Sequence, residues 1–379
     1  MPIRRVTKNS VPLSLSLGLL LLLSCAPDEP VGLSDEQFVR NLTIVDLHND
    51  RSFFLTAKHV DWPQCAGMNL CASRYSNAHF VFSIWRPPTP VRAGPPWALS
   101  REQAIGLNEQ TPFAYIQRAI GELRTRTNLP VSNHSEQLRH RSESLLLGVE
   151  GAFLLSNSEN GAPPSVTELG AMLQRLRADG VLYVGLAWSN FNPYAGTAGQ
   201  SRGLKPAGDE LVRLLIANRL LIDLSHTSDQ TVRDLYAGTG GAYPLFFSHS
   251  SVRALCGHDR NLSDELIRLV AASGGLIGIN FYTRYLNCSG EATAEDLFRH
   301  IEHIRNLIGV DIIAFGSDYD GFAAVPPELR TPDDLRRFAL RLLAAGYTRS
   351  EVEQIYSGNA ISFLERWESN TAQFRRESD

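Results

Sequence analysis

Eight short, almost entirely apolar runs recur along the chain, and helical sequence patterns lie between most of them. Runs of this kind are typical of strands that are buried on both faces, and helical crossovers make such strands parallel. The pattern predicts an α/β fold, most simply a (β/α)8 TIM-type barrel, with an open doubly wound sheet as the alternative. No glycine-rich phosphate loop follows the first run, which disfavours the open sheet. The expected strands cover residues 43–50, 79–85, 145–152, 181–188, 220–226, 244–250, 275–282 and 312–321.

The sequence also indicates where several helices begin. Ser34, Ser165, Ser263 and Thr293 each stand where a side-chain oxygen can cap a first helical turn. Helical stretches are expected at residues 101–124, 165–178, 209–218, 332–345 and 350–367.

Polar side chains gather at the carboxyl ends of the apolar runs. In a strand, residues i and i+2 point to the same side, so His48 and Asp50 are expected to converge at the end of the first run. In a (β/α)8 barrel all the strand ends face one mouth, where active sites lie. The other runs contribute Glu150, His226, His249, Asp318 and Asp320.

This set of imidazoles and carboxylates predicts a metal site. A single strand-end histidine is more often a core residue than a ligand, and Glu150 or Asp318 alone could pair with an arginine or cap a turn. Together, so many ionisable groups would be costly to bury without a cation. Imidazole with carboxylate suits zinc or a similar divalent ion.

The number of candidate ligands favours two ions over one. Five ligands exceed the four that a tetrahedral zinc uses, so we expect two zinc ions per chain. Glu150 is the natural bridge, with a water or hydroxide as the second bridging group. The five expected ligands are His48, Asp50, Glu150, His226 and His249.

The N-terminus is predicted to be an export signal. Arg4, Arg5 and Lys8 precede an apolar run over residues 11–23 that is short for a membrane span. The run ends in LLSC, which resembles a bacterial lipobox with Cys25 as the lipid-bearing residue. Plain secretion with cleavage nearby is the alternative. The chain is therefore expected to be exported and lipid-anchored in the cell envelope, on a periplasmic or extracellular face.

The sequence also indicates which partners are expected and how the chain divides into four segments. The formal net charge is −4 without a basic block, which disfavours a nucleic-acid partner. The only expected membrane contact is the lipid anchor. The segments are a lipoprotein-type signal peptide 1–24, a tether 25–33, a barrel domain 34–367 and a C-terminal tail 368–379.

Four further cysteines bear on the fold. An even number in an exported chain predicts disulfides. A bond between Cys65 and Cys71 would close a small loop, and one between Cys256 and Cys288 would tie two distant loops. A zinc cluster is the alternative, but the spacings contain no CxxC.

Taken together, the motifs resemble those of the membrane dipeptidases, also called renal dipeptidases. The resemblance covers nearly everything from Thr43 to Asn359. The motifs that carry it are DLHND, GVEG, LLIDLSH, FSHSSVRAL, DRNLSDELI, GINFY and GSDYDG. The resemblance implies a binuclear zinc enzyme on an amidohydrolase-type barrel, and a homodimer is one expectation for its assembly.

The resemblance also implies a role for each metal-site residue. His48 and Asp50 would bind one zinc, His226 and His249 would bind the other, and Glu150 would bridge the two ions.

Further roles follow from the same motifs. Asp318 would be the catalytic acid and base that handles the protons of the bridging water. Arg260 would hold the substrate carboxylate, and Tyr285 resembles a substrate-contacting tyrosine. Cys256 and Cys288 match a disulfide pair of the family.

One position departs from the family pattern. Members with dipeptidase activity usually carry THN after the fourth strand, whereas this chain has GLAWSNFNPYAG, with Trp188 in the place of the histidine. Indole offers one N–H donor, no acceptor and no titratable group. Trp188 could still donate to an oxyanion, or it could reshape the substrate pocket.

Three functions are therefore in competition. The first is a zinc dipeptidase that hydrolyses short peptides, including dipeptides with a C-terminal D-residue, through a metal-bridging hydroxide. The second is a metal-dependent hydrolase of another small amide, an N-acyl amino acid or a lactone, which Trp188 favours. The third is a non-enzymatic, lipid-anchored metal-binding protein, which the presence of Asp318 disfavours.

Overall fold

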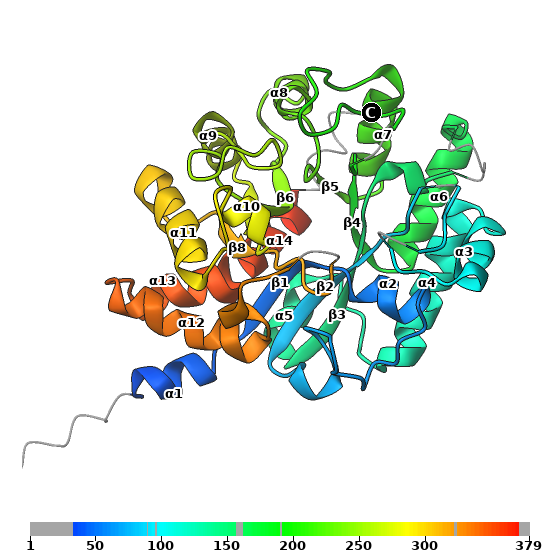
Figure 1. The fold of residues 1–379 in the computed structure, drawn as a ribbon. Coiled ribbons are helices and arrows are strands. Elements are labelled where there is room, and N and C mark those ends of the chain that lie inside the picture. The colour runs from blue at the N-terminus through cyan, green and yellow to red at the C-terminus, as the bar shows by residue number, and fades with distance from the viewer. Residues whose placement is uncertain are drawn as a thin grey trace, which may run out of the picture.

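A computed structural model describes residues 33–370, apart from residues 89, 95–96, 157–161, 190–191 and 322–323. Within this part of the chain, eight strands close into a barrel in sequence order, every pair is parallel, and helices surround the barrel (Figure 1). The predicted (β/α)8 barrel is confirmed, and the open doubly wound sheet is wrong. The strands are β1 Ile44–Asn49, β2 Ala78–Ile84, β3 Glu143–Val149, β4 Val181–Gly185, β5 Leu221–Asp223, β6 Phe246–Ser250, β7 Leu276–Ile279 and β8 Ile313–Phe315.

Most helices form an outer layer around the strands, and the N-terminal helix α1 packs against α12 (Figure 1). None of the described helices combines the length and the apolar character that crossing a bilayer requires. The predicted signal peptide and Cys25 lie outside the described residues. The helices are α1 Asp35–Arg40, α2 Arg51–Thr56, α3 Arg101–Asn108, α4 Pro112–Thr127, α5 Ser135–His140, α6 Val166–Ala178, α7 Pro206–Ala217, α8 Asp229–Gly238, α9 Asp264–Ala272, α10 Thr283–Leu286, α11 Ala294–Ile308, α12 Pro332–Ala344, α13 Arg349–Glu353 and α14 Asn359–Asn370.

Two predicted helices are each divided in the structure. The stretch 101–124 forms α3 and α4, because Thr111 caps a new helix whose first residue is Pro112. The stretch 350–367 forms α13 and α14, which a π-helical segment at Gln354–Gly358 joins. The predicted helix starts are confirmed: Ser34, Ser165 and Ser263 accept hydrogen bonds as N-caps, and Thr293 is the N-cap of α11.

Most strands are shorter than the apolar runs that predicted them, chiefly at their carboxyl ends. The run at 220–226 contains β5, which ends at Asp223, and the run at 312–321 contains β8, which ends at Phe315. His226 and Asp318 have φ angles of 67° and 62°, a left-handed conformation that a strand cannot contain. The last residues of these runs therefore leave the sheet and turn into the mouth of the barrel.

The barrel strands are buried, and the barrel closes where the first and last strands meet. Every residue of β1, β2 and β6 is buried, since helices cover the outside and side chains fill the inside. Strand β1 pairs with β8 at Asp46 and Phe315. The Asp46 carboxylate accepts the backbone N–H of Ser317 at 2.7 Å, so a buried side chain reinforces this short ladder.

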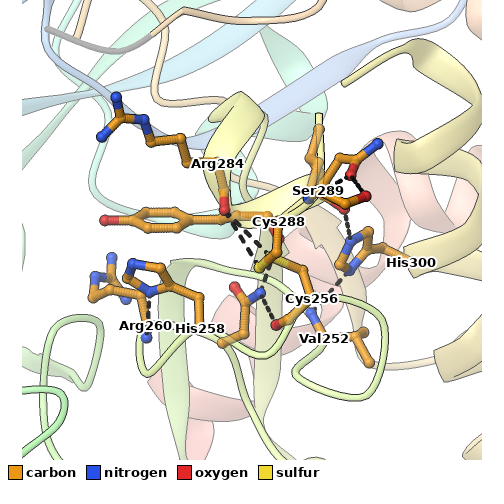
Figure 2. The surroundings of a disulfide bond; sticks show 12 residues. Val252, Cys256, His258, Arg260, Arg284, Cys288, Ser289 and His300 are labelled. Atoms are coloured by element: carbon orange, nitrogen blue, oxygen red, sulfur yellow. Dashed lines mark hydrogen bonds between the residues drawn. A yellow bond between two sulfur atoms is a disulfide. The ribbon is translucent and has the colours of Figure 1, made fainter. Parts of the chain in front are cut away.

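Both predicted disulfides are present. Cys65 is bonded to Cys71, and Cys256 is bonded to Cys288. Figure 2 shows the second bond between the β6–α9 loop, which carries His258 and Arg260, and the segment around α10. The two loops that border this side of the barrel mouth are thus covalently joined.

Asn261 adds a second link between the same two loops. Its side chain is fully buried, and its Nδ2 donates to the carbonyls of Cys256 at 2.9 Å and Tyr285 at 2.8 Å. One amide group therefore satisfies a carbonyl on each loop.

His300, from α11, adds a third link (Figure 2). The backbone N–H of Val252 donates to Nδ1 of His300 at 2.9 Å, and Nε2 lies 3.0 Å from the carbonyl of Leu286. Only the neutral ring with its proton on Nε2 can make both bonds. Burial lowers the pKa of His300 to about 4, which keeps the ring in this form at neutral pH.

This arrangement predicts a pH dependence of stability. The unfolded chain protonates His300 below pH of about 6.5, whereas the folded protein resists protonation until about pH 4. His300 alone should therefore lower the free energy of unfolding by up to roughly 3 kcal/mol as the pH drops through this window. Urea denaturation across pH 4 to 7 would measure it, with His300→Gln as the comparison.

The variant isolates the contribution of one residue. Burial also lowers the pKa of His79 to about 4, but His79 titrates equally in both proteins. The His300→Gln protein should be less stable at neutral pH and should lose less stability on acidification. Parallel curves for the two proteins would show that His300 does not act as described.

Candidate metal centre

The five predicted ligands come from four strand ends and lie together at the barrel mouth. His48 and His249 are within β1 and β6, Asp50 and Glu150 directly follow β1 and β3, and His226 lies in the turn after β5. All five are buried. The closed barrel accounts for this arrangement, since all eight strands end at the same face.

Glu150 is the centre of the cluster. Its Oε1 lies 2.9 Å from Nε2 of His226, 3.5 Å from Nε2 of His249 and 3.7 Å from Nε2 of His48. The Nε2 atoms of His226 and His249 are 3.0 Å apart. One carboxylate oxygen is therefore close to all three imidazoles, so Glu150 could share a cation with them.

Carboxylate oxygens of two aspartates also lie near His48. Its Nε2 lies 3.7 Å from Asp50 Oδ1 and 4.0 Å from Asp318 Oδ1. His48 Nε2 and Asp50 Oδ1 are both buried and have no hydrogen-bond partner among the described residues. Buried polar atoms normally have partners, so these two atoms fit a place that a cation fills.

The charges of the cluster are strongly coupled. Burial by itself lowers the pKa of His48, but the carboxylates of Glu150, Asp50 and Asp318 outweigh it and raise the pKa to about 10. Burial also raises the pKa of Glu150 well above its usual value, against the attraction of His48. Without a cation the cluster must therefore hold protons, whereas a divalent ion supplies the same positive charge.

The other two imidazoles are neutral. Burial, Arg260 and His48 lower the pKa of His226 well below its ordinary value. Burial, His48 and Arg260 do the same for His249. Neutral imidazole is the form that binds a metal ion.

Each imidazole is oriented through its Nδ1 atom. Nδ1 of His48 lies 3.1 Å from the hydroxyl of Tyr183. Nδ1 of His226 lies 3.1 Å from the hydroxyl of Ser189, and Nδ1 of His249 lies 2.8 Å from the hydroxyl of Ser248. Hydrogen bonds at Nδ1 leave Nε2 as the ligand atom in all three rings.

Asp223 holds one of the hydroxyl groups that contact the imidazoles. It was not predicted as a residue of the site. Its Oδ2 accepts the hydroxyl of Ser248 at 2.6 Å, and its Oδ1 accepts the backbone N–H groups of Ser225 at 3.0 Å and Ser248 at 2.8 Å. The only sequence signal was an acidic residue inside the apolar run LLIDLSH. Asp223 therefore fixes Ser248, which in turn fixes His249.

Two residues of the site have a strained backbone conformation. His226 and Asp318 are among the few described non-glycine residues with positive φ, a conformation that typically costs about 1–3 kcal/mol. The carbonyl of His226 accepts the N–H of Ala198 at 2.8 Å, and the N–H of Asp318 donates to the carbonyl of His48 at 3.0 Å. These bonds hold both side chains over the mouth.

The two aspartates after β8 have different surroundings. Asp318 faces the cluster, and its Oδ2 accepts Nδ2 of Asn280 at 3.2 Å. Asp320 does not join the cluster, because its carboxylate accepts the backbone N–H groups of Asn69 and Leu70. The expectation that Asp320 belongs to the polar group at the mouth is wrong, since the chain turns between the two residues.

The predicted substrate residues line the same cavity, whose empty space including the mouth is about 650 Å³. Arg260 donates from Nη2 to the carbonyl of His249 at 3.2 Å, and its guanidinium lies 5.4 Å from the ring centre of Tyr285. Trp188 lies on another part of the wall, with its ring centre 6.4 Å from that of His226. A cavity of this volume accommodates a small molecule.

Comparisons with known proteins add to this geometry. The model of the membrane dipeptidase family, peptidase family M19, matches residues 122–378. Dipeptidase aclJ of Aspergillus oryzae is 30% identical over 227 residues, which are 58% of this chain and 51% of that protein. Dipeptidase 3 of Mus musculus is 28% identical over 251 residues, which are 64% of this chain and 47% of that protein. The chain thus spans about half the length of these two relatives.

A solved structure shares the fold. It is a metallopeptidase from Rhodobacter sphaeroides, liganded with a phosphinate mimic of the dipeptide L-Ala-D-Ala. It matches with a TM-score of 0.67 and 22% identity over 86% of this chain and 99% of that chain. Because the family model matches more than half of its sequence, this chain belongs to the membrane dipeptidase family, peptidase family M19.

Proposed function

We propose that this chain is a zinc-dependent dipeptidase that hydrolyses short peptides with a free C-terminal carboxylate, including dipeptides that end in a D-residue. The observation that carries the proposal is the contact of one Glu150 oxygen with the Nε2 atoms of three imidazoles. Family membership supports it, as do the relatives named dipeptidases and the solved relative with a dipeptide mimic.

The donor set fits two zinc ions. His48 and Asp50 would hold one ion, His226 and His249 the other, and Glu150 would bridge them. The unpartnered atoms His48 Nε2 and Asp50 Oδ1 support this assignment. When bound, the ions supply Lewis-acid activation of a water molecule and of the peptide carbonyl.

Asp318 would move the proton. Its Oδ2 is held by Asn280, so Oδ1 is the oxygen that faces the cluster. Burial raises the pKa of Asp318, and the nearby carboxylate of Asp50 raises it further. A carboxylate with a raised pKa is a suitable base for the attacking water and a suitable acid for the leaving amine.

Arg260 would bind the substrate carboxylate. Two of its nitrogens contact the protein, with Nη2 bonded to His249 and Nη1 lying 3.4 Å from the hydroxyl of Ser250. Its Nε is buried without a hydrogen-bond partner among the described residues. The guanidinium therefore retains donors for an anionic group, and it would favour substrates that end at that point.

The second candidate function is hydrolysis of another small amide, an N-acyl amino acid or a lactone, and Trp188 favours it. The indole cannot accept a hydrogen bond or a proton, so it cannot replace a histidine in every role. Comparing dipeptides with N-acyl amino acids and lactones of similar size would separate the two functions.

The proposal also places the protein outside the cytoplasm. The two disulfides support an oxidising compartment. Cleavage after residue 24 and lipid attachment at Cys25 remain proposals, because both fall outside the described residues. A homodimer likewise stays a prediction.

Metal content is the first test. The soluble domain should contain two zinc ions per chain, and Glu150→Gln should lose at least one, because the amide cannot bridge two cations as a carboxylate does. Elemental analysis after desalting measures this. Glu136→Gln, an exposed position on α5, should keep both ions. Two ions in the Glu150→Gln protein would contradict the bridging role.

Asp318 gives the second test. Asp318→Asn should lower kcat for Ala–D-Ala by about 100- to 10,000-fold, which is the usual range for a positioned acid and base. Its zinc content should be unchanged, since Asp318 is not among the proposed ligands. Asp311→Asn, on the surface before β8, serves as the control. Full activity in Asp318→Asn would remove the residue from the mechanism.

Arg260 gives the third test. Arg260→Lys should raise KM for Ala–Ala by roughly tenfold or more, because an ammonium cannot form the paired bonds of a guanidinium. The native protein should discriminate against the C-terminal amide Ala–Ala–NH2, and the variant should discriminate much less. Equal discrimination by the two proteins would show that Arg260 does not contact the carboxylate.

A further inference from the structure

Three tryptophans form one continuous wall of the catalytic cavity. The ring centres of Trp85 and Trp97 are 4.8 Å apart, those of Trp85 and Trp188 are 4.9 Å apart, and those of Trp97 and Trp188 are 5.9 Å apart. All three rings line the cavity that contains Glu150 and His226. Trp85 is buried, whereas Trp97 and Trp188 are only partly buried. We call these three residues the tryptophan wall.

Close packing on Gly151 and Phe153 fixes the position of Trp188 in the tryptophan wall. Gly151 has a φ of 96°, and a Cβ atom there would lie 3.2 Å from Cβ of Trp188 and under 3.0 Å from the ring of Phe153. The ring of Phe153 is itself 6.4 Å from that of Trp188. Trp188 therefore packs directly on the backbone that follows Glu150, and its distance from the cluster is set by close contact.

Strand order places the tryptophan wall opposite Arg260. Trp85 follows β2, Trp97 lies between β2 and α3, and Trp188 follows β4. Arg260 lies in the loop after β6, and Tyr285 lies in α10 after β7. In a closed barrel of eight strands in sequence order, β2 is across from β6 and β3 is across from β7. The metal-binding side chains therefore lie between an indole side and an arginine side.

The two sides differ in the groups they can recognise. The arginine side offers N–H donors and positive charge, which suit a carboxylate. The tryptophan wall offers flat apolar faces, which bind aromatic or large apolar groups by burial and stacking. A dipeptide whose carboxylate is on Arg260, and whose scissile carbonyl is at the cluster, directs its N-terminal side chain towards the tryptophan wall.

We propose that the tryptophan wall is the specificity subsite for the N-terminal residue of the substrate, and that it selects dipeptides with an aromatic or large apolar side chain there. This inference rests on the proposed dipeptidase function and deepens it. The residue that replaces the family histidine thus becomes part of a binding surface.

A matched set of substrates tests the proposal. Phe–Ala should be hydrolysed with kcat/KM at least about tenfold above that of Ala–Ala, since one phenyl group is buried against the wall. Ala–Phe should show no such gain, because its phenyl group lies on the arginine side. Equal values for Phe–Ala and Ala–Ala, or a preference for Ala–Phe, would overturn the proposal and leave the dipeptidase function standing.

Variants assign the preference to the tryptophan wall. Trp97→Ala should reduce the ratio of kcat/KM between Phe–Ala and Ala–Ala at least about fivefold, whereas Trp97→Phe should largely keep it. Trp367→Phe changes a tryptophan of α14 that packs edge to face against Tyr243, and it should leave the ratio unchanged, because Trp367 does not line the cavity. An unchanged ratio in Trp97→Ala would overturn the assignment, and thermal unfolding would confirm that each variant is folded.

A binding experiment separates failure of the subsite from failure of the proposed function. Phosphinate analogues of Phe–Ala and Ala–Ala can be titrated into the zinc-loaded protein by calorimetry. Tighter binding of the Phe analogue, weakened by Trp97→Ala, would support the subsite even if no dipeptide were hydrolysed, and only the proposed function would then fall. Equal binding of the two analogues would overturn the subsite.

Discussion

The buried carboxylate of Glu150 is the constraint on which the rest of the site depends. It is buried, lies within 3.7 Å of three imidazole nitrogens, and is close to the carboxylates of Asp50 and Asp318. Ionised groups packed so closely are stable only if their charges balance. The raised pKa of His48, about 10, shows how strongly the cluster attracts positive charge. Divalent metal ions would meet that demand at the Nε2 atoms that converge on Glu150.

The packing around the predicted ligands also depends on particular residues. Tyr183 reaches His48 across the barrel interior because Gly148 has no side chain, and a Cβ there would lie 2.3 Å from the tyrosine ring. Gly151, three residues later, makes the same kind of room for Phe153 and Trp188. The two glycines of GVEG therefore make room for the tyrosine that contacts His48 and for Phe153 and Trp188. The short motif owes its composition to packing as much as to chemistry.

The sequence predicted the barrel and the ligand cluster because both follow from periodicity: apolar strands end at one face, so their terminal side chains meet. It could not predict what depends on backbone turns or on partners far along the chain. Asp320 was expected beside Asp318, yet the positive φ of both residues turns the second carboxylate towards Asn69. Asp223 was missed because its partners, Ser225 and Ser248, become visible only when β5 and β6 are side by side. The break before α4 depended on Pro112, which starts a helix as readily as it ends one.

Arg260, the residue proposed to bind the substrate carboxylate, also acts on two of the predicted metal ligands. Its charge contributes to the lowered pKa values of His226 and His249, so it helps to keep both rings in the neutral form that a cation requires. Its bond to the carbonyl of His249 ties the guanidinium to the strand that carries a ligand, and the disulfide, Asn261 and His300 hold the surrounding loops. Two divalent cations together with this arginine would outweigh the carboxylates of Glu150, Asp50 and Asp318. The cavity would then attract an anionic substrate end to the arginine side and leave the apolar end for the uncharged indoles opposite.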